Sequence, residues 1–347
     1  MLYNYPPEAT NGNWLHWCLA QTLMQVHREL DLKKTLPKWP LIIPDEYREK
    51  LKLKHGLRDK LKTYTNALKG LSDAERQRVL ETLVSQNQIR RVLCGRRSCK
   101  RIDSLPETIR EPAKDLFTCA FGLLTSLEIR DSHYQTIYKR SDAKLCPFCG
   151  LEYFDAPGAP REDDDHYLPK SQYPFAAANL WNLVPMGHKC NSRYKGTADP
   201  LMTGGGIRRK VLNPYGAQCF TISLIGTVPL GPPDGITPSW QIAFLPSFEE
   251  ATTWEELFDL STRYRRDVLD PHWQKWLEEF GAFAREKDVT DEASLRDALA
   301  SYCRIMRAWG LSDRAFLKSA YFDVILDEFN KQNGHIIGLL SRITYDR

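Results

Sequence analysis

The sequence contains no long apolar run. A helix that crosses a membrane needs about 18 consecutive apolar residues, and no stretch of the 347 residues approaches that length. The first residues, MLYNYPPEATNGNW, lack the basic and apolar segments of a signal or transit peptide. Internal repeats and low-complexity tracts are also absent. These absences argue against membrane-spanning, solenoid and fibrous proteins, and we expect a cytoplasmic globular protein without a membrane partner.

A large excess of charge of one sign is lacking too. The chain has 48 Lys and Arg against 44 Asp and Glu, which gives a net charge of +4 and a pI near 8.5. This mildly basic balance suits a polyanionic partner but does not require one. With 42% hydrophobic residues, the composition is that of an ordinary globular protein. A chain of this length is expected to form two or three folding units.

The cysteines lack the even number and regular spacing of a disulfide framework. Nine of them are spread unevenly along the chain, so we expect reduced thiols. Four stand among apolar residues and are predicted to be small buried side chains: Cys18, Cys119, Cys219 and Cys303.

Residues 1–140 show the pattern of a helical region. Apolar residues recur every three or four positions, as in amphipathic helices. Ser72 with Glu75, and Ser104 with Glu107, are candidate capping boxes at the start of two helices.

The rest of the chain changes character twice. Residues 141–216 are rich in Pro, Gly, Asn, Asp, Cys and His, which is typical of turns and short strands around a site. Residues 217–347 begin with two predicted strands, CFTISLIG and WQIAFLP, which the turn-forming PLGPPDG joins, and continue with helical patterns. The fold class that we expect is α+β and mostly α, with a small core between helical N- and C-terminal regions.

Two basic clusters lie in the N-terminal region. The first is REKLKLKHGLRDKLK, residues 48–62, and the second comprises Arg90, Arg91, Arg96, Arg97, Lys100 and Arg101. Either could follow a phosphate backbone, and either could equally be a solvated helical face.

A Cys-x-x-Cys segment opens the middle region. The thiolates of Cys146 and Cys149 can converge on one tetrahedral ion, because the turn between them folds back on itself. A redox pair is the alternative, but such a motif normally opens a helix, and here a loop rich in Pro, Gly and Asp follows. His188 and Cys190 form a second close pair, so we expect a structural Zn²⁺ held by three cysteines and one histidine.

An ordered set of residues lies within and around the two half-sites. It resembles the motif of the HNH, or ββα-metal, nucleases, and the matching positions are Cys146, Cys149, Asp165, His166, Pro169, Asn182, Leu183, Cys190, Asn191, Lys195 and Gly196. The resemblance implies a zinc-knuckled ββα-metal core, and cleavage of nucleic acid to a 3′-hydroxyl and a 5′-phosphate with a single catalytic metal ion.

The chemistry of phosphodiester hydrolysis accounts for three of these residues. A neutral imidazole can accept a proton from the attacking water, which is the role expected for His166. Oxygen donors suit a hard divalent ion, so Asp165 and Asn191 are expected to bind Mg²⁺ or Mn²⁺, which would neutralise charge on the phosphate. Neighbouring strand residues point to opposite faces, so the strand must end or twist at this position.

The resemblance also implies supporting roles. Asn182 takes the place of the family's middle asparagine, which fixes the loop between the strands and orients the base, and Asn179 is its rival. Basic residues would contact phosphates without reading the base sequence, and they are Arg193, Lys195, Arg208, Arg209 and Lys210.

The sequence departs from the family at one ligand position. Members with zinc usually have a cysteine where this chain has Gly187, and His188 lies one residue later. If His188 does not bind zinc, it becomes a second candidate for phosphate contact.

The stretch from Asp165 to Gly196 also resembles the HNH subunits of bacterial anti-phage systems such as Septu. That resemblance implies DNA as the substrate and an ATPase or sensor subunit as a partner. The alternative to an endonuclease is a non-catalytic, zinc-stabilised module that binds nucleic acid or protein.

Overall fold

We describe the protein from a computed structural model. It covers residues 1–141, 143–159, 164–229 and 238–345, with the backbone alone at residues 164 and 165. The described part is mostly helical, with short strands. It divides into two compact units, which we call the N-terminal unit (residues 4–146 and 153–218) and the C-terminal unit (residues 1–3, 147–152 and 219–347). The N-terminal unit therefore includes most of the segment expected to form a nuclease core.

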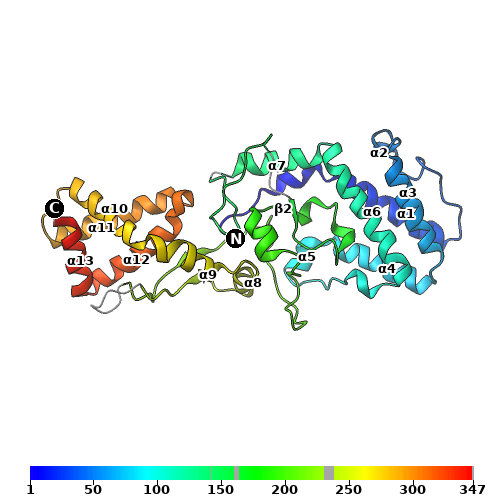
Figure 1. The fold of residues 1–347 in the computed structure, drawn as a ribbon. Coiled ribbons are helices and arrows are strands. Elements are labelled where there is room, and N and C mark those ends of the chain that lie inside the picture. The colour runs from blue at the N-terminus through cyan, green and yellow to red at the C-terminus, as the bar shows by residue number, and fades with distance from the viewer. Residues whose placement is uncertain (142, 160–163, 230–237, 346–347) are drawn as a thin grey trace. The chain divides into compact units, whose positions relative to one another are not determined.

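The N-terminal unit is built on α-helices. They are α1 (Trp14–Asp31), α2 (Asp45–Leu51), α3 (His55–Lys69), α4 (Asp73–Gln86), α5 (Ile89–Leu93), α6 (Glu107–Ser126) and α7 (Ile129–Arg140), with the short 3-10 helices η1 (Pro7–Gly12) and η2 (Ile102–Ser104). Apolar residues at helical spacing, such as Leu15, Leu19 and Leu23 of α1, are fully buried. Helix α3 packs along α6 in this core (Figure 1).

A pair of short strands packs against these helices. The elements of this part are β1 (Asp164–His166), η3 (Pro174–Ala176), η4 (Leu180–Asn182), β2 (Leu183–Pro185) and the π-helix η5 (Lys189–Lys195). The strands are antiparallel, with His166 opposite Leu183. The segment between them enters the helical core, where Phe175 lies edge-on to Phe117 of α6 with 5.3 Å between ring centroids. The core thus fixes the segment that joins the strands.

The C-terminal unit contains the second strand pair and a set of helices. Its elements are β3 (Thr221–Ser223), β4 (Ala243–Leu245), α8 (Glu249–Phe258), α9 (Leu260–Tyr264), the π-helix η6 (Arg265–Leu269), α10 (Asp270–Glu286), α11 (Glu292–Trp309), η7 (Ser312–Arg314), α12 (Ala315–Asn330) and α13 (Gly334–Tyr345). β3 and β4 pair antiparallel inside the two predicted strands. Of the predicted connection PLGPPDG, only Pro229 lies within the described residues. Helix α11 packs along α12, and α10 along α13 (Figure 1).

No helix in the described part is both long and apolar enough to cross a membrane.

All nine cysteines are free thiols, and their burial differs. Cys18 and Cys303 are buried as expected, but Cys119 is half-buried and Cys219 is exposed. The prediction for Cys219 was wrong because, just before β3, the neighbouring Phe220 takes the buried position instead.

Candidate functional site

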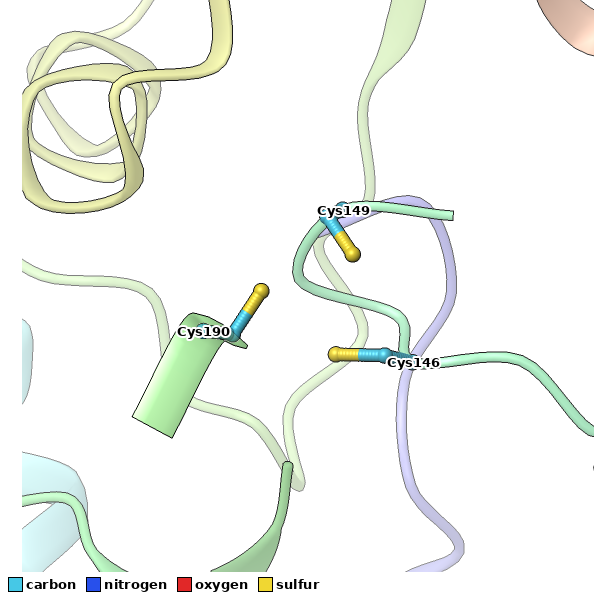
Figure 2. Close-up of side chains that lie close together, drawn as sticks. All are labelled: Cys146, Cys149 and Cys190. Carbon is cyan, nitrogen blue, oxygen red and sulfur yellow. The ribbon is translucent and has the colours of Figure 1, made fainter. Parts of the chain in front are cut away.

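Three cysteine side chains converge at one point. Cys146, Cys149 and Cys190 have no exposed surface, and their sulfur atoms all lie within 4.8 Å of one another. Figure 2 shows the three side chains pointing toward a common centre. A buried group of three thiols is a suitable donor set for a metal ion such as zinc. The prediction that these cysteines form one group is therefore confirmed.

The backbone around Cys149 supports a knuckle. The N–H of Leu151 donates to the Cys149 sulfur at 3.4 Å. Gly150 has a φ of +67°, and a Cβ there would lie 2.5 Å from a side-chain carbon of Leu2, so only glycine fits this turn. The Tyr264 hydroxyl donates to the Cys149 carbonyl at 2.9 Å. These contacts hold the Cys149 side chain in its position.

The structure does not bring His188 into this group. Its side chain is exposed, and it is not among the residues whose donor atoms gather there. A carboxylate oxygen of Glu152 lies 3.9 Å from the Cys149 sulfur and 3.8 Å from the guanidinium of Arg263. Glu152 also lies outside the three-cysteine group, but carboxylates are zinc ligands, and its contact with the Cys149 sulfur makes it a candidate for the fourth position that sequence reasoning did not identify.

The second candidate centre surrounds His166. This residue ends β1 and is 8% exposed. Its Nε2 lies 3.1 Å from the carbonyl oxygen of Ala177. Because a carbonyl only accepts hydrogen bonds, Nε2 carries the proton and Nδ1 is left with the lone pair. Of the two expected alternatives, an end or a twist of the strand, the structure shows that β1 ends at His166.

The surroundings keep the His166 ring neutral. Burial lowers the pKa of His166 to about 3, and the cations Lys170, Lys195 and Arg130 add to this effect. The ring of Phe121 in α6 lies 4.4 Å from the His166 ring, measured between centroids. Lys170 and Arg130 each lie 5.2 Å from the centre of the Phe121 ring. The ring is therefore unprotonated at neutral pH, and the same low pKa weakens it as a proton acceptor until a bound anion such as a phosphate raises that pKa.

Asn182 holds the loop that follows β1. It is fully buried, its Oδ1 accepts from the Leu168 N–H at 2.7 Å, and its Nδ2 donates to the carbonyls of Leu168 and Ala176 at 3.1 and 3.3 Å. Its rival Asn179 instead bonds Asn13, with 2.9 Å between the two side chains, and caps η4. Only Asn182 fixes the loop directly after the candidate base.

The two proposed ligands of the catalytic ion are described to different degrees. Asp165 pairs with Val184 in the strand ladder, but its side chain lies outside the described part of the chain. Asn191 is half-buried in η5, where its carbonyl accepts from the Gly196 N–H at 2.7 Å. π-Helical turns such as η5 are frequent at functional sites. Because the Asp165 side chain is not described, the proposed ion site stays a prediction.

Two of the predicted phosphate contacts have other roles. Lys195 is 2% exposed, and its Nζ donates to the His166 carbonyl at 3.0 Å. The guanidinium of Arg208 donates to the carbonyls of Leu201 and Arg209 at 3.0 and 2.8 Å, and also to that of Val92. Both cations therefore bind the backbone of the protein itself.

The other three predicted contacts differ in exposure. Arg193 and Lys210 are exposed, whereas Arg209 is half-buried and donates to the Asp199 carbonyl at 3.2 Å.

Sequence reasoning missed Phe121, Arg130 and Lys170. Lys170 had a weak signal, because it lies in the same stretch as His166 and next to Pro169. Phe121 in α6 and Arg130 in α7 had no signal in the sequence, because only the fold brings them close to His166.

Similarity to known proteins adds nothing to this geometry. The chain matches no known protein-family model, no curated protein and no solved structure.

Proposed function

We propose that this protein is a metal-dependent endonuclease of the HNH type, with His166 as the general base. It hydrolyses phosphodiester bonds in nucleic acid, and DNA is the expected substrate. The observation that carries the proposal is the setting of His166. The imidazole is neutral, its tautomer is fixed by a carbonyl at 3.1 Å, and it lies at the end of a strand beside cationic side chains.

The local fold supports this assignment. β1 and β2 are antiparallel, and η5 follows β2 with Asn191 on it. Asn182 ties the loop after His166 to the end of η4. The order of strand, loop, strand and helix is the one that the HNH resemblance implies.

In the proposed reaction, Nδ1 of His166 accepts a proton from the attacking water. The Ala177 carbonyl holds the ring in the tautomer that this step requires. A Mg²⁺ or Mn²⁺ ion held by Asp165 and Asn191 would supply positive charge to the phosphate and the leaving oxygen.

Lys170 is suited to bind the phosphate. Its side chain is exposed and lies over Phe121. An ammonium at this position would attract the anionic phosphodiester toward His166. Lys195, in contrast, holds the His166 backbone through its carbonyl.

The three-cysteine group has a structural role in this proposal. A zinc ion would be held by Cys146, Cys149 and Cys190 and would hold the segment before β1 near the start of η5. Reduced thiols suit the cytoplasm. A role in anti-phage defence, with an ATPase or sensor subunit as partner, is part of the proposal through the sequence resemblance alone.

The test is a nicking and linearisation assay on plasmid DNA with a divalent ion, with single-stranded DNA and RNA alongside and the product of a neighbouring gene added. We expect His166→Ala to lower the cleavage rate by about 10² to 10⁴, the usual contribution of a general base. Nucleic-acid affinity and zinc content should be unchanged, because the imidazole acts only on the attacking water. Asn191→Ala should regain part of its activity at raised Mg²⁺ or Mn²⁺.

His27→Ala is a matched control, because His27 is another buried histidine whose pKa is lowered by burial, and it lies on α1. This control should cleave at the wild-type rate if it remains folded. If His166→Ala also cleaves at that rate where a chelator stops cleavage, His166 is not the base. A wild-type protein that binds nucleic acid but cleaves none of these substrates would favour the non-catalytic module.

A further inference from the structure

Two basic segments that are far apart in the sequence meet on the N-terminal unit. The Val211 N–H donates to the Leu93 carbonyl at 2.9 Å. A Cβ at Gly95 would lie 3.4 Å from a side-chain carbon of Lys210, so this lysine lies against the loop after α5. The basic cluster of residues 90–101 and the cluster of residues 208–210 therefore adjoin.

Three arginines on this surface form no ion pair with a carboxylate of the described residues. Arg91 and Arg96 are exposed and Arg97 is half-buried. Within the described part of the chain, the ion pairs of this cluster join Lys100 to Glu81 and Arg101 to Asp199. Arg91, Arg96 and Arg97 belong to neither pair, so their charge is available to an external anion.

A hollow of about 580 Å³ lies beside Arg97 and is also lined by Arg101 and Arg208. Arg208 uses its guanidinium on backbone carbonyls. Arg101 pairs with Asp199 at 2.6 Å, yet its side chain remains 39% exposed. Asp199 also accepts from the Tyr173 hydroxyl at 2.7 Å. Its carboxylate is therefore shared between Arg101 and Tyr173. The lining thus has three guanidinium groups and, besides them, the exposed carboxylate of Asp103, so the hollow is basic on balance.

This surface is connected to the loop that follows His166. The Ile102 N–H donates to the Gln172 carbonyl at 2.9 Å. Tyr173, the next residue, bonds Asp199 and donates its own N–H to the Pro169 carbonyl at 2.8 Å. An anionic chain bound along the arginines would thus lie on the same framework as the candidate base.

We infer that Arg91, Arg96 and Arg97 form a binding surface for the phosphodiester backbone of nucleic acid, outside the site of cleavage. The inference rests on the proposed function in that the bound backbone is that of the substrate. Guanidinium groups without acidic partners match the regular negative charge of such a backbone. The contacts are to phosphates, so they hold the substrate without reading its bases.

The experiment compares two triple variants in a His166→Ala background, so that binding is measured without cleavage. The first variant is R91Q/R96Q/R97Q. The second, K33Q/K34Q/K38Q, removes the same charge from three exposed lysines between α1 and α2. Affinity for labelled duplex DNA, single-stranded DNA and RNA of equal length is measured against salt concentration. Thermal unfolding confirms that both variants are folded.

We expect the arginine variant to lose about 0.9 units of salt-dependence slope for each lost contact on duplex DNA, or roughly 2 to 3 units in all. The lysine variant should keep the parent slope. Equal slopes in all three proteins, or equal losses in both variants, would overturn the inference, as would a parent protein that binds none of the three probes. If the arginines are needed for binding but the protein with His166 intact cleaves nothing, the surface stands and the proposed function fails.

Discussion

At the scale of single residues, the candidate base depends on one carbonyl. The oxygen of Ala177 accepts from Nε2 of His166, and so decides which ring nitrogen has the free lone pair. Ala177 itself has no functional side chain. A sequence motif cannot show this contribution, because every residue has a backbone carbonyl and only the fold places that of Ala177 next to His166.

The cysteine group leads to a prediction about zinc retention. We expect Cys149→Ser to lower both zinc content and thermal stability, because the free energy of structural zinc binding contributes to folding. A loss of about 2 kcal/mol would lower the unfolding midpoint by roughly 4 to 8 °C in a unit of this size. His188→Ala should retain zinc, since His188 is exposed and outside the group. Metal analysis of purified protein and thermal unfolding measure both.

Glu152→Ala extends the comparison to the candidate carboxylate near Cys149. We expect it to retain less zinc than His188→Ala. If His188→Ala loses as much zinc as Cys149→Ser, the histidine is a ligand after all. If the folded wild-type protein contains no zinc, the group is not a zinc site.

At the scale of elements, a buried ammonium joins η5 to β1. Lys195 Nζ donates to the His166 carbonyl at the end of the strand. We expect Lys195→Met to lower cleavage and to reduce stability by about 1 to 3 kcal/mol, because it leaves buried carbonyl groups without their donor. The salt dependence of nucleic-acid binding should stay the same.

Arg193→Met is the matched variant on the same helix, since Arg193 is exposed. It should leave stability unchanged and lower the salt-dependence slope by about one unit, as expected for one lost phosphate contact. A Lys195→Met protein that loses a unit of slope at full stability would return Lys195 to the role of a phosphate contact.

Local patterns predicted several elements well. Ser72 and Glu75 form the expected capping box at the start of α4, and β3 and β4 lie inside the two predicted strands. The second box was wrong, because Ser104 ends a 3-10 helix and donates to the Arg101 carbonyl, while α6 starts after Pro106. A capping box depends on residues three positions apart, so the sequence can suggest one. The sequence does not show when the capping side chain bonds another group instead, as the Ser104 hydroxyl does with the Arg101 carbonyl.

The candidate site was predictable only in part. Cys146, Cys149 and Cys190 could be grouped because zinc ligands come in close pairs with recognisable spacing. The burial of Lys195, and the use of the Arg208 guanidinium on backbone carbonyls, could not be predicted, since a basic residue in a turn-rich segment normally faces solvent. Burial depends on which distant segments pack over a residue, and sequence spacing does not report that.

At the scale of the whole molecule, the strand pair and the helices should unfold together. Phe175 is fully buried between Phe117 and Tyr64, with ring centroids 5.3 and 6.5 Å away. We expect Phe175→Ala to destabilise the N-terminal unit by about 3 to 5 kcal/mol. We also expect cleavage to be lost over the same temperature range as the helical signal. The measurements are denaturant unfolding for the stability, and the helical signal and cleavage rate as functions of temperature.

Phe248→Ala is the control, because Phe248 is 51% exposed and belongs to the C-terminal unit. It should change neither curve. If Phe175→Ala keeps full activity at temperatures where the helical signal is lost, the strand pair folds independently and the coupling is wrong.

The segment that joins β1 and β2 belongs to the same core as α1, α3 and α6. Grafting the strands and η5 onto a foreign scaffold would therefore expose the face that carries Phe175 and Leu180 to water. The region around His166 is therefore not a self-contained folding unit in this protein. Natural exchange of this region between genes would have to carry the N-terminal helices along, so recombination breakpoints within residues 4–146 and 153–218 should be selected against.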